Sequence, residues 1–195
     1  MGEVLVTCPH CGKQHPVDTN ALKAGKTKTQ PALFDEAQPK KVKKTVSADD
    51  AKKRAFVMEF DGGSRGSPGP AGVGVRLLTE DGVELYELGE FIGNVTNNVA
   101  EYTGLLRGLA AAIAWQAAKL TIRADSELVV RQINGQYKVK SPDLKPLYEK
   151  ALRLMDQIPE VKVFHVYREN NKRCDQLANE AMDKKGKIEP VGPLP

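Results

Sequence analysis

The sequence from residue 55 onward predicts a mixed α/β fold, with a five-stranded mixed sheet and helices on both of its faces. Two observations support this prediction. Strand-like and helix-like segments follow one another in the order β-β-β-α-β-α-α-β-α, without an internal repeat. The first three strands are joined by short turns and the later ones by helices. Short turns favour antiparallel pairing, whereas helical connections favour parallel pairing.

The three antiparallel strands come first. Apolar side chains at alternate positions predict a strand over Ala55–Asp61, which the Gly- and Pro-rich segment GGSRGSPGPAG then ends. Two more strands are predicted over Val73–Thr79 and Val83–Ile92. The turn residues Glu80–Gly82 separate them, so the three strands form a meander.

The second half alternates helices with strands. A long Leu- and Ala-rich segment predicts the first helix, for which Asn97 or Asn98 is a plausible N-cap. Helices are expected over Asn98–Lys119, Ser126–Asn134, from Pro142 to about Ile158, and near Asn171–Lys184; strands are expected over Lys119–Ala124 and Val161–Tyr167.

Charge divides the chain into parts. Residues 1–54 hold 11 Lys and Arg against 6 Asp and Glu, so the first quarter carries all of the net charge of +4. We therefore expect a small Cys/His segment over 1–20, a basic flexible linker over 21–54, a folded domain over 55–186 and a tail over 187–195. The linker is interpreted either as a solvated spacer or as a basic arm that holds a polyanion.

The N-terminal segment contains half of a zinc-binding motif. Cys8 and Cys11 resemble one knuckle of a zinc ribbon, and His15 or His10 could complete a set of ligands. No second Cys-x-x-Cys pair follows. A structural zinc ion and a metal-free remnant both remain open as interpretations.

Composition also excludes some classes of protein. No run approaches the roughly 18 apolar residues that a membrane span requires, and the N-terminus lacks the pattern of a secretory signal. Three cysteines cannot form a complete disulfide framework. We therefore expect a cytoplasmic protein without membrane contact.

Four acidic residues lie at the ends of strands or the starts of helices. They are Asp61, Glu101, Asp125 and Asp175. Each alone has a structural explanation as a turn residue, a helix cap or a partner of the helix dipole. Strand ends and helix starts on one side of a sheet can converge on one cleft, and a hard cation requires several oxygen ligands. The set of four therefore predicts a metal site.

Four segments resemble the motifs of type 1 ribonuclease H, in order and at suitable spacings. They are FDGGSRGSPG, NNVAEYTGLLRGL, RADSELVVRQING and ENNKRCDQLANEA, and the resemblance covers residues 55 to about 184. It implies a ribonuclease H-like fold in which Asp61, Glu101, Asp125 and Asp175 are the catalytic carboxylates. It further implies two Mg²⁺ or Mn²⁺ ions and cleavage of the RNA strand of RNA–DNA hybrids to 5′-phosphate and 3′-hydroxyl ends. Nothing in the sequence demands a dimer, so a monomer is expected.

The resemblance also implies a set of substrate contacts. Residues that match the family's hybrid-binding positions are Gly63, Ser64, Gly66, Thr96, Asn97 and Asn98. Glycine lets backbone approach a sugar-phosphate closely, and the two asparagine amides can sense RNA 2′-hydroxyls. Many family members have an arginine two positions before the residue that matches Thr96, whereas this sequence has Asn94 there. This difference predicts a lower affinity for the DNA strand.

The sequence departs from the best-known members in two further places. Only QYKVKSP stands where they carry a basic protrusion, and the loop before the last acid holds no histidine. Both features are typical of a compact branch of the family. His165 falls inside the predicted last strand and is interpreted as structural. Two other functions remain open: a non-catalytic hybrid- or RNA-binding module, and a related nuclease with another nucleic-acid substrate.

Overall fold

A computed structural model describes residues 4–7, 14–17 and 54–189, and the chain divides into two units, Met1–Pro39 and Lys40–Pro195. In the first unit, β1 (Val4–Thr7) pairs antiparallel with β2 (Gln14–Val17), and Val4 lies opposite Val17. The predicted zinc ligands Cys8, Cys11 and His10 lie outside the described residues, as does the predicted linker except for Arg54. Of His15 only the backbone, in β2, is described.

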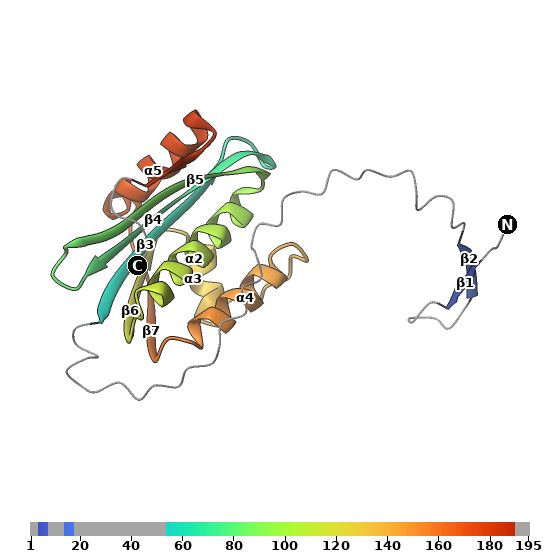
Figure 1. Cartoon of the computed structure of the whole chain (residues 1–195), viewed down its shortest axis with the longest axis horizontal. Helices are drawn as coiled ribbons and strands as arrows, with labels where there is room; N and C mark the ends of the chain where they lie inside the picture. The colour runs from blue at the N-terminus through green and yellow to red at the C-terminus, as the bar shows by residue number, and fades with distance from the viewer. Residues whose placement is uncertain (1–3, 8–13, 18–53, 190–195) are drawn as a thin grey trace. The chain divides into compact units, whose positions relative to one another are not determined.

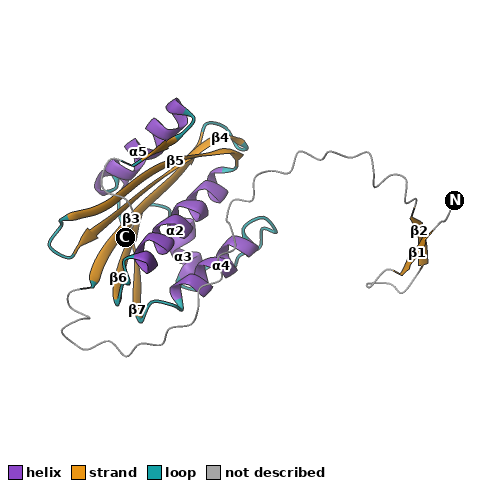
Figure 2. Ribbon diagram, viewed as in Figure 1, coloured by secondary structure: helices purple, strands orange, loops and turns teal. Residues whose placement is uncertain are grey.

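The second unit contains a six-stranded mixed sheet in the order β7-β6-β3-β4-β5-β8 (Figures 1 and 2). The strands β3, β4, β5 and β8 are antiparallel neighbours, whereas β3, β6 and β7 run parallel. The strands are β3 (Ala55–Ser64), β4 (Gly69–Thr79), β5 (Glu84–Val95), β6 (Lys119–Ala124), β7 (Glu160–His165) and β8 (Lys187–Ile188). The predicted mixed α/β fold is confirmed.

Helices cover both faces of this sheet. They are α2 (Asn97–Ala114), α3 (Glu127–Ile133), α4 (Lys145–Met155) and α5 (Lys172–Lys184), and a short 3-10 turn, η2 (Arg168–Asn170), precedes the last. The long helix α2 packs on β3 and β4, and α4 packs on α2. The helix α5 covers the opposite face over β4 and β5 (Figure 1). No helix within the described ranges is long and apolar enough to cross a membrane.

Glycines let both long helices touch the sheet with their backbones. A Cβ atom added at Gly74 would lie 2.0 Å from the carbonyl oxygen of Cys174 in α5, and one at Gly72 or Gly89 would meet the same helix at 2.5 Å or 2.6 Å. On the other face, a Cβ atom at Gly62 would lie 2.2 Å from the backbone of Ala100 in α2. These positions require glycine because no side chain fits between helix and strand.

Several predicted boundaries were wrong. The strand β3 continues past Asp61 to Ser64 and β4 begins at Gly69, so the predicted Gly/Pro loop is a hairpin whose glycines mostly belong to strands. The helix α2 is capped by Thr96, whose Oγ1 accepts from Val99 N at 3.3 Å, and not by an asparagine. The predicted five strands lacked β8, which pairs with β5 at Gly89 and Glu90.

Candidate active site

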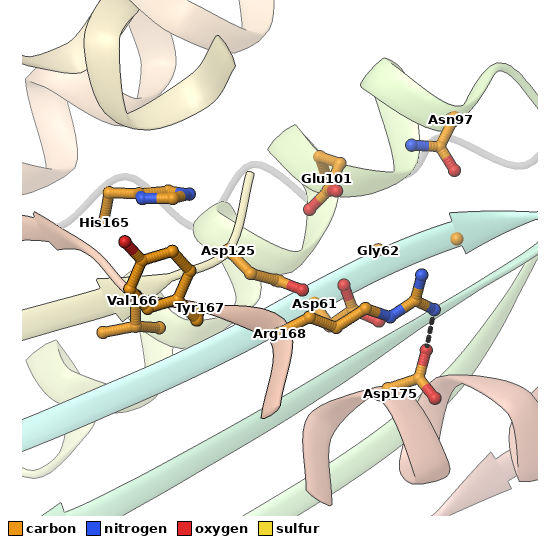
Figure 3. A pocket seen from close by; sticks show the side chains of 11 residues that line it. Asp61, Gly62, Asn97, Glu101, Asp125, His165, Val166, Tyr167, Arg168 and Asp175 are labelled. Carbon is orange, nitrogen blue, oxygen red and sulfur yellow. Dashed lines mark hydrogen bonds and ion pairs between the residues drawn. The ribbon is translucent and has the colours of Figure 1, made fainter. Parts of the chain in front are cut away.

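The four predicted acids line one pocket, although they come from four different elements (Figure 3). Asp61 lies in β3, Glu101 in α2, Asp125 directly after β6 and Asp175 in the first turn of α5. The other lining residues are Gly62, Gly63, Asn97, His165, Val166, Tyr167 and Arg168. The structure thus brings the four predicted acids together, but Asp61 lies within β3 and not at its end, and Glu101 lies beyond the first turn of α2.

Crowding and burial raise the proton affinity of two of these carboxyls. Burial, followed by the charges of Asp125 and Asp175, raises the pKa of Asp61 to about 7. Burial, followed by the charges of Asp61 and Asp125, raises the pKa of Glu101 well above its ordinary value. One oxygen of Glu101, Oε2, is buried without a hydrogen-bond partner. The pocket therefore favours a cation, which would compensate the concentrated negative charge.

Neighbouring polar groups hold Asp125 in place. The Nδ2 atom of Asn171 donates to Asp125 Oδ1 at 2.9 Å and to the carbonyl oxygen of Phe60 at 2.7 Å. Asn171 is only 2% exposed. Because Phe60 directly precedes Asp61, this one amide ties the residue after β6 to the middle of β3 next to the site. Asn171 is thus a positioning residue that the sequence prediction did not include.

Arg168 supplies positive charge to the pocket. Its Nη2 atom lies 2.7 Å from Asp175 Oδ1, as the dashed line in Figure 3 shows, and its charge lowers the pKa of Asp61 against the larger effect of burial. The Arg168 side chain is 75% exposed. Because an exposed arginine is free to exchange partners, it can leave Asp175 when a cation or a phosphate enters.

An ion pair between a buried Glu87 and a half-buried Arg173 fixes the start of α5. Arg173 donates from Nε and Nη2 to the two carboxylate oxygens of Glu87 at 2.8 Å and 2.7 Å. The Glu87 side chain is 1% exposed, and the hydrogen bond from Arg173 lowers its pKa. This two-pronged contact and the backbone packing at Gly74 hold the helix turn that carries Asp175.

The donor set suits a hard divalent cation, since it offers four carboxylates and a buried oxygen without a partner. As the side chains stand, no three His, Cys, Asp or Glu residues in the described part of the chain are arranged to hold one ion. Two of the acids have other partners: Asp175 pairs with Arg168, and Asp125 accepts from Asn171. Binding of an ion therefore requires side chains to turn within the pocket, above all that of Asp175.

Two of the predicted substrate-binding residues line this pocket. These two are Gly63 and Asn97. The Asn97 Oδ1 atom accepts from Ser64 N at 3.2 Å, which ties the start of α2 to the end of β3. Ser64 Oγ donates a hydrogen bond to the carbonyl oxygen of Gly66. The backbone of Gly66 has a positive φ of 110°, a conformation that favours glycine.

The other two predicted contacts lie at the start of α2. Thr96 is the N-cap, whereas Asn98 is exposed. Gly62 packs against the backbone of Ala100 in α2 and also lines the pocket.

Sequence reasoning missed part of the pocket wall. His165, interpreted as structural, is the last residue of β7, is exposed and lines the pocket together with Tyr167. In Figure 3 both lie across the acids from Asn97. One signal was available: His165 ends a strand parallel to β6, whose own end carries Asp125. Sites form at the carboxyl ends of such strands.

Known proteins resemble this chain over the same region. Residues 59–181 match the family described as Reverse transcriptase-like. Over 128 residues the chain is 48% identical to the "Bifunctional protein Rv2228c" of Mycobacterium tuberculosis, a match that covers 65% of this chain and 35% of that protein. The chain thus spans about a third of the length of this relative.

Two solved structures share the fold. The crystal structure of RNase H1 from Halobacterium salinarum superimposes with a TM-score of 0.65 at 41% identity and covers 67% of this chain and 98% of its own. LC11-RNase H1, solved in complex with an RNA/DNA hybrid, gives 0.63 at 43% identity with coverage of 67% and 98%. By the family match over more than half of its length and by these relatives, the chain belongs to the ribonuclease H family.

Proposed function

We propose that residues 55–186 form an endonuclease that hydrolyses the RNA strand of RNA–DNA hybrids and leaves 5′-phosphate and 3′-hydroxyl ends. The observation that carries the proposal is the gathering of Asp61, Glu101, Asp125 and Asp175 in one pocket. A relative with 43% identity was solved with an RNA/DNA hybrid, which supports the same substrate here. A pure binding module gains nothing from buried carboxylates that repel one another.

The family generally depends on divalent metal ions, and we propose Mg²⁺ or Mn²⁺ for this chain, with two ions held by the four carboxylates. When bound, such ions activate the attacking water and stabilise the departing 3′-oxygen. The chain's own residues prepare the pocket. Asn171 orients Asp125, and the Glu87–Arg173 contact fixes the turn that carries Asp175. Arg168 is placed to exchange its carboxylate partner for a phosphate oxygen.

We assign the selection of hybrid substrates to the side of the pocket that lies across the acids from His165 and Tyr167 in Figure 3. Gly63 and Asn97 line it, and Ser64 and Asn98 adjoin them. Amide groups both donate and accept hydrogen bonds, so they can read the 2′-hydroxyl that distinguishes RNA from DNA. Thr96 is engaged as the cap of α2, where backbone N–H groups favour a phosphate of the DNA strand.

Divalent ions should stabilise the protein more at pH 8 than at pH 5. Without ions, the raised pKa of Asp61 means that the folded state keeps a proton that the unfolded state loses above pH 3.8. The ion-free protein therefore loses stability as the pH rises from 3.8 to about 7. Ions bind the ionised carboxylates, so their stabilising effect grows through the same window.

Melting temperatures measured from pH 5 to pH 8, with and without Mg²⁺ or Mn²⁺, check this expectation. Glu101→Gln removes one charge from the pocket and should reduce the shift, whereas Glu149→Gln, on α4, serves as the matched control. If ions raised the melting temperature by the same amount at every pH, Asp61 would not be a metal ligand that must lose its proton before the ion binds.

The proposed activity is tested by cleavage of end-labelled substrates with the full chain. The substrates are an RNA–DNA hybrid, double-stranded RNA, single-stranded RNA and double-stranded DNA, each with Mg²⁺ or Mn²⁺ and with a chelator. Cutting confined to the RNA strand of the hybrid supports the proposal. Cutting of another substrate would favour the alternative nuclease, and binding of hybrid without any cutting would favour the binding module.

A further inference from the structure

Charged side chains form a row across the four inner strands of the sheet, on the face where α5 packs. In the strand register, neighbours in this row are Arg123 of β6, Glu59 of β3, Arg76 of β4 and Glu87 of β5. Paired positions of neighbouring strands share one face of a sheet, so the charges alternate along the row. Arg173 at the start of α5 adds a fifth charge by its contact with Glu87. We call these five residues the charge ladder.

Arg76 is the centre of the charge ladder. Its Nη1 atom lies 2.9 Å from Glu59 Oε2, and its Nε atom lies 3.5 Å from Glu87 Oε1. Its Nη2 atom contacts the carboxylate of Glu84. The side chains of Glu59, Arg76 and Glu87 are only 11%, 18% and 1% exposed. Water cannot readily replace these contacts, so one planar guanidinium connects three carboxylates from β3 and β5.

The charge ladder adjoins two of the four acids in the pocket. Glu59 precedes Asp61 by two residues in β3, so both side chains lie on the same face of the sheet. Arg173 precedes Asp175 by two residues in α5. Asp61 and Asp175 come from different layers of the fold, so the packing of α5 on the sheet sets the distance between them. The ladder therefore connects the strand of one acid to the helix turn of the other.

Buried charges at this place do more for geometry than for stability. Removal of charges from water costs free energy that ion pairs barely offset, and apolar side chains of similar volume often stabilise a protein as well. A guanidinium, however, holds carboxylates in defined directions. Direction matters beside a metal site, because Mg²⁺ demands near-ideal octahedral geometry from its ligands.

Given the proposed function, we propose that Arg76 is a positioning residue for the metal site. Through Glu59 it holds the part of β3 next to Asp61. Through Glu87, the partner that fixes the start of α5, it holds the turn that carries Asp175. Arg76 does not line the pocket, so it acts on the ions only through the separation of these two acids.

The test measures the affinity of the full chain for Mn²⁺ without nucleic acid, by electron paramagnetic resonance of the free ion. Arg76→Met keeps much of the side chain's length but removes the guanidinium. It should weaken Mn²⁺ binding by about tenfold or more, the usual effect of losing a residue that orients metal ligands. Electrostatics alone predicts the opposite sign, because the loss of a positive charge makes the surroundings of the pocket more negative. An affinity equal to or above that of the wild type would overturn the proposal.

Two further variants separate positioning from a loss of stability. Arg107→Met is the matched control, since it breaks the partly buried pair of Arg107 with Glu90, between α2 and β5. It should lower the melting temperature but leave the affinity for Mn²⁺ unchanged, and equal weakening by both Met variants would contradict a positioning role. If Arg76→Met does not fold, Arg76→Lys replaces it. Lysine keeps the charge without the planar fork and should weaken Mn²⁺ binding by a smaller factor, so unchanged binding would again overturn the proposal.

Cleavage of the hybrid distinguishes this inference from the proposed function. The low activity of Arg76→Met should rise toward that of the wild type as Mn²⁺ is increased, because a weaker site fills at a higher ion concentration. If the wild type cleaves the hybrid but Arg76→Met binds Mn²⁺ equally well, the positioning inference is wrong and the proposed function stands. If Arg76→Met weakens Mn²⁺ binding but the wild type cleaves no hybrid, the nuclease proposal is wrong and the positioning role stands.

Discussion

Asp125→Asn is expected to lower kcat on an RNA–DNA hybrid by roughly a thousand-fold, the effect of several kcal/mol lost from metal-assisted catalysis. Asp125 lies directly after β6 and lines the pocket with the other three acids. The substitution removes a negative charge but almost no volume. The amide oxygen at this position can still accept the hydrogen bond that Asn171 Nδ2 donates at 2.9 Å. The loss should therefore come from charge and not from displaced structure.

The stability of this variant provides a second readout. The charge of Asp125 raises the pKa of both Asp61 and Glu101, so its removal relieves repulsion. At pH 8 without divalent ions, the melting temperature of Asp125→Asn should equal or exceed that of the wild type. Asp156→Asn changes an exposed acid at the end of α4 and should retain full activity. A large fall in the melting temperature of Asp125→Asn would instead indicate a structural role for this acid.

The site was predictable where chain direction alone determines position. Asp125 follows a strand that is parallel to β3, and Asp61 lies in β3 itself, so both had to meet at one edge of the sheet. Glu101 and Asp175 follow helix starts at the same edge. This reasoning holds best for Asp125 after β6 and Asp175 in the first turn of α5, whereas Asp61 lies within β3 and Glu101 beyond the first turn of α2.

The contribution of the last strand and its loop was harder to predict. Arg168 lies in a short 3-10 turn, and only the folded chain shows that its guanidinium reaches Asp175. His165 sits at a strand end where an alternating pattern cannot tell a pocket from open solvent. The positions of Arg168 and His165 relative to the acids depend on how β6 and α5 pack beside them. Local sequence does not determine how close these elements lie.

Local sequence also does not tell which partner a strand glycine approaches. A glycine in a strand suggests a ligand or another backbone close by, and the sequence alone does not say which. The structure shows that Gly62 lies against α2 and Gly74 against α5, whereas Gly63 has only the Met182 side chain nearby, at 3.9 Å from an added Cβ. The strand β8 was also missed, since two residues are too few to form a pattern.

Gly74→Ala should lower the stability of the protein by about 3 kcal/mol or more, at or above the upper end of overpacking costs. An added methyl group would lie 2.0 Å from the carbonyl oxygen of Cys174 and 3.0 Å from its Cα, so a rigid helix backbone stands in its way. Thermal melting should show a fall of roughly 10 °C for a domain of this size. Gly186→Ala is the matched control, because its added atom meets nothing closer than Lys184 O at 3.7 Å.

The same substitution should also impair catalysis in the molecules that remain folded. Cys174 directly precedes Asp175, so a helix that moves away from β4 carries the carboxylate with it, while the Glu87–Arg173 contact resists the movement. Activity measured well below the melting temperature should therefore show a reduced kcat with a smaller change in KM, since Gly63 and Asn97 lie on β3 and α2 and do not move with α5. Wild-type kcat in a destabilised Gly74→Ala variant would mean that the position of Asp175 does not depend on this contact. A wild-type melting temperature would mean that α5 and β4 are not in backbone contact at Gly74. Wild-type kcat in a destabilised variant would leave the Glu87–Arg173 ion pair as the contact that holds the last carboxylate in the site.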